Sequence, residues 1–359
     1  MKIIIIGGGV AGLAIGWRLA EAGQEVTVLE RSQPGGGATG ASAGMLAVTA
    51  ELQDASLEEM EFARYSNVLW PSFAEKLEAV SGRKINYAAK GALLLADDAA
   101  ALSRLSRQAG PGRVLLEPPQ VRALVPLVAA DGIAGGLWSA SEAQIDNRSL
   151  GPALAVALQK AGGRILANEA AVRLERERDG RVIGVQTPFG RHAADAVILA
   201  AGAWSGLLDK AGEPVSPVKG QMILLAPPAG ETVPGPVIWG GGIYAVSRAE
   251  GLAIGATMED AGFDTTVTPQ AREMLLRSAE KLMPALGRWT LIEHWAGLRP
   301  RAPDGLPMLG PTRSEGLWLA GGQYRNGILF APAVAETVAD QILGRASPIA
   351  AFDPRRFGT

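Results

Sequence analysis

The N-terminal segment constrains the fold most strongly, because it combines a buried strand, a glycine-rich turn, a helix and a second strand. Residues 2–6 form a short, largely apolar run rich in β-branched side chains, which is typical of a strand inside a parallel sheet. Gly7, Gly9 and Gly12 follow in the spacing G-x-G-x-x-G, and a helical pattern comes next. The second strand, residues 25–30, ends on a carboxylate. This order predicts a dinucleotide-binding unit.

Each part of this motif has a mechanical role at a bound nucleotide. The first glycine permits the tight turn, the second lets backbone approach a pyrophosphate, and the third lets helix and strand pack closely. The pyrophosphate would lie at the helix N-terminus, beside the N–H groups of Val10 and Ala11. Glu30 would accept hydrogen bonds from the adenosine ribose, and an acid here argues against a 2′-phosphate. FAD and NAD both remain open.

Composition narrows the class of protein. At 359 residues, with 48% hydrophobic and 19% charged residues, the chain can bury the core of one large domain or two. The net charge of −2 argues against nucleic acid or an acidic membrane as partner. No stretch approaches the roughly 18 apolar residues of a membrane span. The chain enters a strand almost at once, so we expect no signal peptide and a cytoplasmic location.

The sequence contains no cysteine, which excludes disulfides, thiolate catalysis, iron–sulfur clusters and a flavin tethered through cysteine. His192 and His294, the two histidines, stand in no metal-binding spacing, so we expect no metal site.

The remaining pattern predicts two kinds of sheet. Small residues fill positions 31–46 on the cofactor side of the second strand, where we expect backbone to contact a ligand. Strands expected at 164–166, 194–201 and 317–320 would join the nucleotide-type sheet, with helices at 149–161 and 331–343. Strands expected at 91–96, 113–116, 132–137, 218–226, 243–247, 252–257 and 290–295 would form a second, mostly antiparallel sheet.

Two helices and a hairpin complete these predictions. A helix should begin after Ser56, in a capping box, and continue past Pro71 to residue 80. A second helix should begin at Pro269, and Asp179-Gly180 should turn a hairpin. Because the two sheets alternate along the chain, we expect interleaved domains. One comprises residues 1–80, 140–213 and 296–359, and the other residues 81–139 and 214–295.

Several motifs together resemble the D-amino acid oxidase family of flavoproteins, and within it the glycine oxidases of bacterial thiamine biosynthesis. The N-terminal glycine motif is the first of them, and the others cover nearly the whole chain in the same order. They are G-A-S-A-G-M-L at 40–46, V-K-G-Q at 218–221, A-G-L-R-P at 296–300 with D-G-L-P at 304–307, and Y-R-N-G-I-L at 324–329. The resemblance implies an α/β fold in which a Rossmann-like FAD domain of glutathione-reductase type is interleaved with an α+β substrate domain.

The resemblance also implies non-covalent FAD. The residues 323–329 would wrap the pyrimidine edge of the flavin. Together, the glycine motif and the resemblance predict the following cofactor contacts: Gly7, Gly9, Val10, Ala11, Gly12, Glu30, Arg31, Ala38, Thr39, Ala43, Gly44, Met45, Val172, Gly202, Trp204, Gln323, Tyr324, Arg325, Asn326, Gly327, Ile328 and Leu329.

Four positions match the substrate site of the family. Arg299 would hold the substrate carboxylate in a two-pronged ion pair, which suits the planar guanidinium. Tyr244 would donate to the same carboxylate, Arg325 would lie near substrate and flavin, and Met258 would line the pocket. Relatives carry histidines at two places where this chain has Val48-Thr49 and Gln323, which leaves substrate preference open.

The implied reaction is oxidative deamination of glycine, sarcosine or small D-amino acids by hydride transfer to flavin N5. Dioxygen would reoxidise the flavin to give hydrogen peroxide, and the imino acid would hydrolyse to a keto acid and ammonia. A role in thiamine thiazole synthesis and assembly into a dimer or tetramer would follow from the same resemblance. Alternatives are a broader D-amino acid or N-methyl amino acid oxidase, a dehydrogenase using another electron acceptor, and a tRNA-modification flavoprotein.

Overall fold

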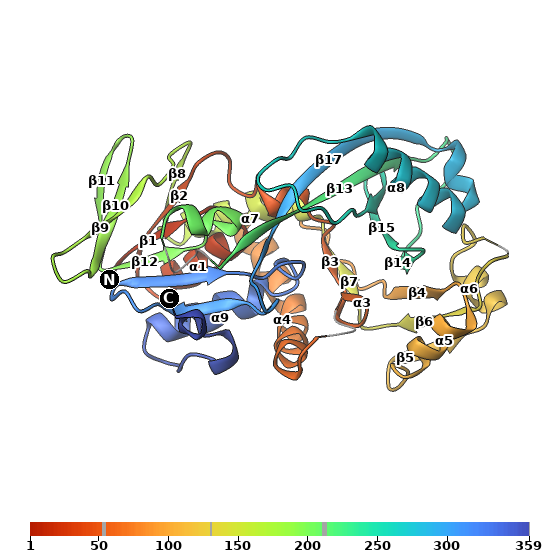
Figure 1. Ribbon diagram of the computed structural model, residues 1–359, viewed down its shortest axis with the longest axis horizontal. Coiled ribbons are helices and arrows are strands. Elements are labelled where there is room, and N and C mark those ends of the chain that lie inside the picture. The colour runs from red at the N-terminus through yellow and green to blue at the C-terminus, as the bar shows by residue number, and fades with distance from the viewer. Residues whose placement is uncertain (52–54, 130, 210–213, 359) are drawn as a thin grey trace.

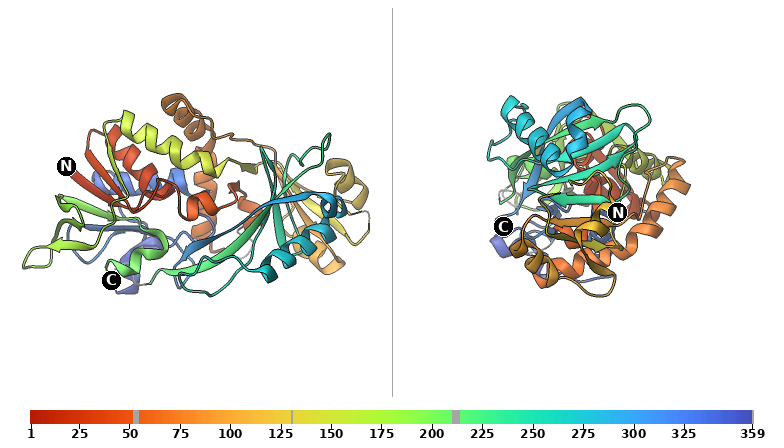
Figure 2. Two further views of the ribbon diagram at one scale, coloured as in Figure 1. Left: turned by 90° about the horizontal axis from the view of Figure 1, so that it is seen from above. Right: turned by 90° about the vertical axis from the view of Figure 1, so that its right-hand side faces the viewer.

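The computed structural model of the protein describes residues 1–51, 55–129, 131–209 and 214–358. Two large sheets occupy opposite ends of an elongated molecule (Figures 1 and 2). Both chain termini lie at the end that holds the six-stranded sheet. The predicted cofactor domain (1–80, 140–213 and 296–359) includes some residues that the structure does not describe. These are residues 52–54, 210–213 and 359.

The six-stranded sheet contains the N-terminal strand at its centre. Its order is β18-β19-β12-β1-β2-β8, and all neighbouring strands are parallel except β18 and β19. The sequence motif therefore forms the expected nucleotide-type sheet. The strands are β1 (Lys2–Ile6), β2 (Glu25–Glu30), β8 (Arg164–Ala167), β12 (Ala196–Leu199), β18 (Met308–Pro311) and β19 (Leu317–Gly321).

Side chains of β1 point alternately to the two faces of this sheet, and both faces are covered. Ile3 and Ile5 pack against helices on one face, whereas Ile4 and Ile6 face a small three-stranded sheet on the other. The helices are α1 (Val10–Glu21), α4 (Leu57–Ser81), α7 (Asn147–Lys160) and α9 (Ala331–Ile342). The small sheet contains β9 (Arg173–Arg176), β10 (Val182–Thr187) and β11 (Gly190–Ala193).

The eight-stranded sheet has the order β17-β13-β16-β15-β14-β4-β6-β5, and only β14 and β4 pair in parallel. Along β13, Ile223 packs on one face with helix α8 (Pro269–Leu282), while Met222 packs on the other face with Tyr244. The latter face packs against Ala43, Ala47 and Ala50, which belong to the segment that follows β2. The strands are β4 (Ala92–Ala96), β5 (Arg113–Leu116), β6 (Gly135–Ser139), β13 (Ser216–Ala226), β14 (Val237–Gly240), β15 (Ile243–Arg248), β16 (Gly251–Gly255) and β17 (Thr290–Arg301).

Short elements join the two sheets. Helices α2 (Ala38–Ala41) and α3 (Val48–Glu51) lie in or just after the small-residue stretch, and β3 (Met45–Leu46) between them pairs with β7 (Ala143–Gln144). Near the far end of the eight-stranded sheet lie α5 (Ala99–Ser106) and α6 (Pro118–Leu124) (Figure 1).

Several predicted elements were displaced or missed. The strand expected at 290–295 continues to Arg301, because β13 pairs with it past Gly297 and even pairs Pro217 with Pro300. The strand expected at 132–137 is β6, shifted to Gly135–Ser139. The sequence pattern also missed α6, β11, β14 and β18, whose short runs lie beside prolines and glycines.

The expected helix after Ser56 forms as one uninterrupted element, α4. The Ser56 hydroxyl accepts a hydrogen bond from the Glu59 N–H (3.1 Å), as expected of an N-cap. Pro71 lies inside the helix, and the helix ends at Gly82, whose φ of +73° is the left-handed conformation typical of a glycine C-cap.

Candidate active site

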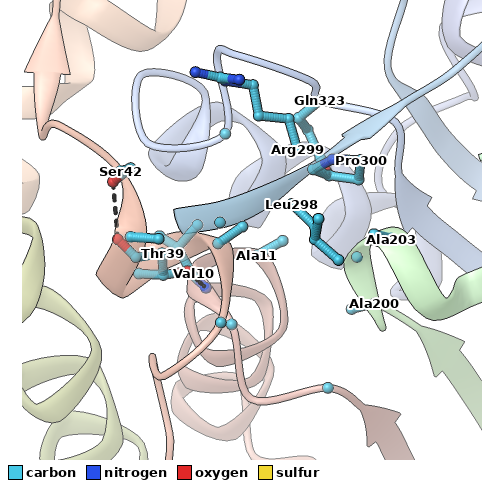
Figure 3. Close-up of a pocket in the computed structure, with 18 of the residues that line it drawn as sticks. Val10, Ala11, Thr39, Ser42, Ala200, Ala203, Leu298, Arg299, Pro300 and Gln323 are labelled. Atoms are coloured by element: carbon cyan, nitrogen blue, oxygen red, sulfur yellow. Dashed lines mark hydrogen bonds between the residues drawn. The ribbon is translucent and has the colours of Figure 1, made fainter. Parts of the chain in front are cut away.

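A cavity with a volume of about 450 Å³ lies between the two sheets. Its walls come from both sheets and from the segments that join them: Figure 3 shows Val10 of α1, Thr39 of α2, Ala200 after β12 and Arg299 of β17 around one space. The cavity gathers most of the predicted site residues: Gly7, Gly9, Val10, Ala11, Glu30, Arg31, Ala38, Thr39, Ala43, Gly44, Met45, Gly202, Trp204, Tyr244, Arg299, Gln323, Tyr324, Arg325, Asn326, Gly327, Ile328 and Leu329.

The three glycines of the motif have different surroundings. At Gly7, where φ is +110°, a Cβ would lie 2.3 Å from the Ala200 carbonyl oxygen. At Gly12 a Cβ would lie 2.0 Å from the Gly7 carbonyl oxygen, so this glycine brings α1 against β1 instead of lining the cavity. The nearest atom to a Cβ at Gly9 would be Thr39 Oγ1, at 3.6 Å. Gly9 therefore exposes backbone to the cavity at the helix N-terminus, where a pyrophosphate binds most readily.

Polar contacts order the nucleotide end of the cavity. The Val10 N–H donates to Thr39 Oγ1 (2.9 Å). The Glu30 carboxylate accepts from the Gly8 N–H (2.8 Å) and from the Ser32 N–H (2.8 Å). These bonds hold the Glu30 carboxylate at the end of β2, in the position that the dinucleotide motif requires.

A cluster of Arg31, Trp204 and Phe263 lies at this end of the cavity. The Arg31 guanidinium lies 3.5 Å from the centre of the Trp204 ring, within the range of a cation–π interaction. Trp204 also contacts Phe263, with ring centres 5.6 Å apart. The cluster therefore joins the end of β2 to a loop that belongs to the eight-stranded sheet.

The small-residue stretch is held by side chains that the sequence pattern did not reveal. Asn147 Nδ2 donates to the carbonyl oxygens of Thr39 (2.8 Å) and Gly40 (3.0 Å). Arg248 donates to the Ser42 carbonyl oxygen (2.8 Å), and the Trp295 indole N–H donates to the Ala41 carbonyl oxygen (2.9 Å). Because these residues lie far away in sequence and belong to no motif, only the fold could identify them.

Arg299 lies on β17, next to β13, with its guanidinium over Gly220. A Cβ at Gly220 would lie 2.2 Å from Arg299 Nη1, so any larger residue would displace the guanidinium. Nη1 donates to the Thr257 carbonyl oxygen (3.2 Å). Because a guanidinium carries five N–H donors, this contact orients the group and leaves donors for a ligand in the cavity.

Tyr244 lies on β15 beside Arg299 and is 8% exposed. Burial raises the pKa of the Tyr244 hydroxyl, and the positive charge of Arg299 opposes that rise. The hydroxyl lies 3.6 Å from the Met222 sulfur, and the ring contacts Trp239 with 5.1 Å between centres. Tyr244 therefore presents a protonated donor next to the guanidinium at neutral pH.

Arg325 forms an ion pair with Glu51, which the sequence interpretation had not singled out. Arg325 Nε lies 2.8 Å from Glu51 Oε2, and the Glu51 side chain is 7% exposed. Burial raises the pKa of the Glu51 carboxyl, while the charges of Arg325 and Arg299 oppose that rise. The only signal in the sequence was an acid shortly after the G-A-S-A-G-M-L motif.

The loop 323–329 is fixed by helix α4. Asn326 Nδ2 donates to Glu59 Oε1 (3.1 Å), and the Leu329 carbonyl oxygen accepts from Ser66 Oγ (2.6 Å) and from the Trp70 indole N–H (2.9 Å). These contacts hold the loop against the cavity.

Two predicted residues lie outside this lining, in addition to Gly12. Val172 is 57% exposed, and its neighbours Ala170 and Ala171 line the cavity instead. Met258 is 64% exposed and lines an adjoining outer cavity of about 370 Å³, which shares Tyr244, Arg299 and Arg325 with the first. Whether Val172 or Met258 contacts a ligand stays a prediction.

Comparison with known proteins identifies the family. The family model "FAD dependent oxidoreductase" (DAO) matches residues 2–341. This chain belongs to the DAO family of FAD-dependent oxidoreductases. Glycine oxidase from Pseudomonas aeruginosa is 36% identical over 353 residues, covering 96% of this chain and 95% of that protein. The chain is 38% identical to the bifunctional protein ThiO/ThiG of a Synechocystis strain, but spans only 54% of its length.

The structural comparison agrees with the family assignment. The crystal structure of glycine oxidase from Geobacillus kaustophilus superposes with a TM-score of 0.92 and 31% identity, covering 99% of this chain and 98% of that one. The predicted fold class and the choice of FAD are thereby confirmed, and NAD is set aside. The exposed Gly9 backbone, the ordered Glu30 and the cavity that both residues line fit such a dinucleotide.

In the described part of the chain, no helix is both long and apolar enough to cross a membrane. The same residues contain no group of three or more histidine, aspartate or glutamate side chains arranged to hold a metal ion.

Proposed function

We propose that this DAO-family enzyme oxidises glycine and other small amino acids, with dioxygen as the electron acceptor. The overall products would be a keto acid, ammonia and hydrogen peroxide. The observation that carries the proposal is Arg299, whose guanidinium lies beside the Tyr244 hydroxyl in the wall of the cofactor cavity. Two donors converging at this point suit a carboxylate. The relatives named glycine oxidase support the choice of a small substrate.

The FAD would lie along the cavity, with its adenosine beside Glu30 and Arg31 and its pyrophosphate at Gly9 and Val10. The flavin would face the loop 323–329. When bound, FAD supplies an acceptor for the hydride that leaves the substrate Cα. We therefore propose that residues 1–80, 140–213 and 296–359 form the cofactor domain, and that residues 81–139 and 214–295 form the substrate domain.

The protein side chains would contribute mainly binding and orientation. Arg299 and Tyr244 would fix the carboxylate, which sets the position of Cα and lowers the entropy cost of reaching a reactive arrangement. The loop 323–329, held by Asn326 and by the Leu329 carbonyl, would keep its shape during turnover. A rigid wall of this kind would also exclude water from the reacting centre.

A second candidate, oxidation of larger amino acids, is favoured by one observation. The outer cavity of about 370 Å³ adjoins the first at Tyr244, Arg299 and Arg325. A side chain extending from a substrate held by Arg299 would find space there, between Trp239 and Met258.

The experiment that tests both candidates is anaerobic mixing of the purified flavoprotein with glycine, sarcosine, D-alanine and D-phenylalanine. Fastest bleaching of the flavin absorption by glycine or sarcosine supports the main proposal. Fastest bleaching by D-phenylalanine supports the second candidate. Bound flavin that none of these bleaches would refute both assignments. Oxygen uptake by the reduced enzyme then tests dioxygen as the acceptor.

A further inference from the structure

Glu51 is a buried charged group that the proposed reaction does not yet use. It ends helix α3, lines the cavity and is ion-paired with Arg325 at 2.8 Å. Burial of a carboxylate is costly unless a partner compensates it, and Arg325 supplies that partner. A charged pair kept in the wall of a ligand cavity affects the charge of any ligand that binds there.

The charges around this end of the cavity can be counted. Among the described lining residues, Arg299, Arg325 and Glu51 are the charged side chains at the substrate end, whereas Glu30 and Arg31 lie at the nucleotide end. Glu51 compensates Arg325, which leaves the single positive charge of Arg299 for a ligand. The outer cavity adds one acid and one base, Asp97 and Arg104, and so leaves the balance unchanged.

Glu142 is a second buried acid near Glu51, but its side chain does not line the cavity. It accepts hydrogen bonds from the Thr49 N–H (2.9 Å) and from Ser139 Oγ (3.0 Å), and it is not among the residues that line the cavity. Glu142 therefore bonds to the chain through Oε1 and lies outside the cavity wall, whereas Glu51 borders the space that a ligand would fill.

We propose that Glu51 determines the charge specificity of the substrate site. Resting on the function proposed above, this inference assigns Arg299 to the substrate carboxylate and Glu51 to the substrate amino group. A second carboxylate would meet the Glu51 charge in a cavity of low dielectric and be rejected. The site would thus select amino acids with one carboxylate and one amino group over diacids of similar size.

The test compares ligand binding to the FAD-loaded wild-type enzyme and to the variants Glu51→Gln and Glu61→Gln. Glu61→Gln is the matched control, since it removes the same charge from an exposed position on α4 that lies outside the lining of both cavities. Acetate and malonate, which carry no amine to oxidise, are titrated by their effect on the flavin absorption. The dissociation constant of glycine is taken from the concentration dependence of anaerobic flavin reduction.

Glu51→Gln should leave Arg325 without its counter-ion. Malonate should then bind about tenfold more tightly to this variant than to the wild type, and glycine about tenfold more weakly. Each change corresponds to about 1.4 kcal/mol of binding free energy. The dissociation constant of acetate should change by less than about threefold, because acetate contacts only the Arg299 side of the site. Glu61→Gln should bind all three ligands with the wild-type dissociation constants.

The outcomes separate this inference from the proposed function. Failure of acetate to bind the wild-type enzyme would refute the carboxylate site itself, whatever Glu51 does. Acetate binding with unchanged malonate and glycine affinities in Glu51→Gln would overturn the role of Glu51. If Glu51→Gln does not retain FAD, the variant Arg325→Gln decides the question. Its uncompensated Glu51 should weaken the binding of malonate at least about tenfold more than the binding of acetate. Equal weakening of the two ligands would overturn the inference.

Discussion

At the scale of single residues, Arg299 should dominate substrate affinity. Its guanidinium is oriented by the Thr257 carbonyl and lies over Gly220, where an added Cβ would come within 2.2 Å of Nη1. Removing one partner of a buried charged contact costs about 2–5 kcal/mol, so Arg299→Met should raise the dissociation constant of acetate about 30-fold or more. Arg301→Met, on the same strand but outside both cavities, is the control and should change it less than about twofold. Equal effects of the two variants would contradict the assignment.

The glycine motif allows a prediction that separates folding from cofactor binding. An added Cβ at Gly12 would meet backbone at 2.0 Å, whereas at Gly9 its nearest neighbour would be Thr39 Oγ1 at 3.6 Å. Gly12→Ala should therefore destabilise the apoprotein by about 1–3 kcal/mol. Gly9→Ala should leave apoprotein stability nearly unchanged but weaken FAD binding, because its methyl group would enter the pyrophosphate site. Denaturant unfolding of the apoproteins and FAD titration measure the two effects, and the reverse pattern would refute this division.

The residues that sequence could predict are those whose role depends on local backbone or on a motif. Gly7 and Gly9 follow from the strand-turn-helix order, and Arg299 follows from the A-G-L-R-P motif. Asn147 and Glu51 could not be predicted, because their roles depend on partners brought near by the fold: Asn147 bonds to α2, and Glu51 pairs with Arg325. No periodicity in the chain encodes such contacts.

At the scale of secondary structure elements, one ion pair links α7 to β17 and hence the two sheets. Arg148 donates to Glu293 in a two-pronged contact of 2.8 and 2.6 Å, and these bonds lower the pKa of Glu293. A lowered pKa in the folded state means that the pair stabilises the fold above the ordinary glutamate pKa of 4.5 and that this contribution is lost as pH falls below it. Because the two side chains are 41% and 37% exposed, we expect the ion pair to add less than about 1 kcal/mol to the free energy of unfolding at pH 7.

The measurement is the melting temperature of Glu293→Gln and the wild type between pH 7 and pH 3. The variant should melt no more than about 2 °C lower at pH 7, and the difference should shrink toward zero in acid. Glu273→Gln, which breaks the more exposed pair with Arg277 on α8, should show no measurable difference at any pH. If the difference in melting temperature between Glu293→Gln and the wild type grows as the pH falls, the predicted pH dependence is wrong.

Elements could be predicted where the pattern of apolar residues was uninterrupted, as in β1 and α4. They were missed where pairing with another strand overrides local propensity. The strand β17 continues past Gly297 because β13 supplies hydrogen-bond partners, and β14 forms beside the glycines at 240–242 because β4 and β15 flank it. Such strands depend on neighbours that local sequence does not specify.

At the scale of the whole molecule, the two halves meet at the nucleotide end through Arg31, Trp204 and Phe263. Phe263 comes from the loop between β16 and α8, while Arg31 and Trp204 line the cavity from the six-stranded sheet. An aromatic pair contributes about 0.5–1.5 kcal/mol, so Phe263→Ala should release FAD about two- to tenfold faster. Because Phe263 is 44% exposed, the fold itself should be little affected. The FAD fluorescence that appears after dilution measures the release.

The matched control for this prediction is Phe189→Ala, which removes an equally large ring that is 77% exposed on the three-stranded sheet side of the molecule. FAD release from Phe189→Ala should equal that of the wild type. If Phe263→Ala also releases FAD at the wild-type rate, then the eight-stranded half contributes nothing to retention at this end, and the cavity is closed by the six-stranded half alone. If release is faster, cofactor retention depends on the contact between halves, and any motion that separates them would also expose the nucleotide.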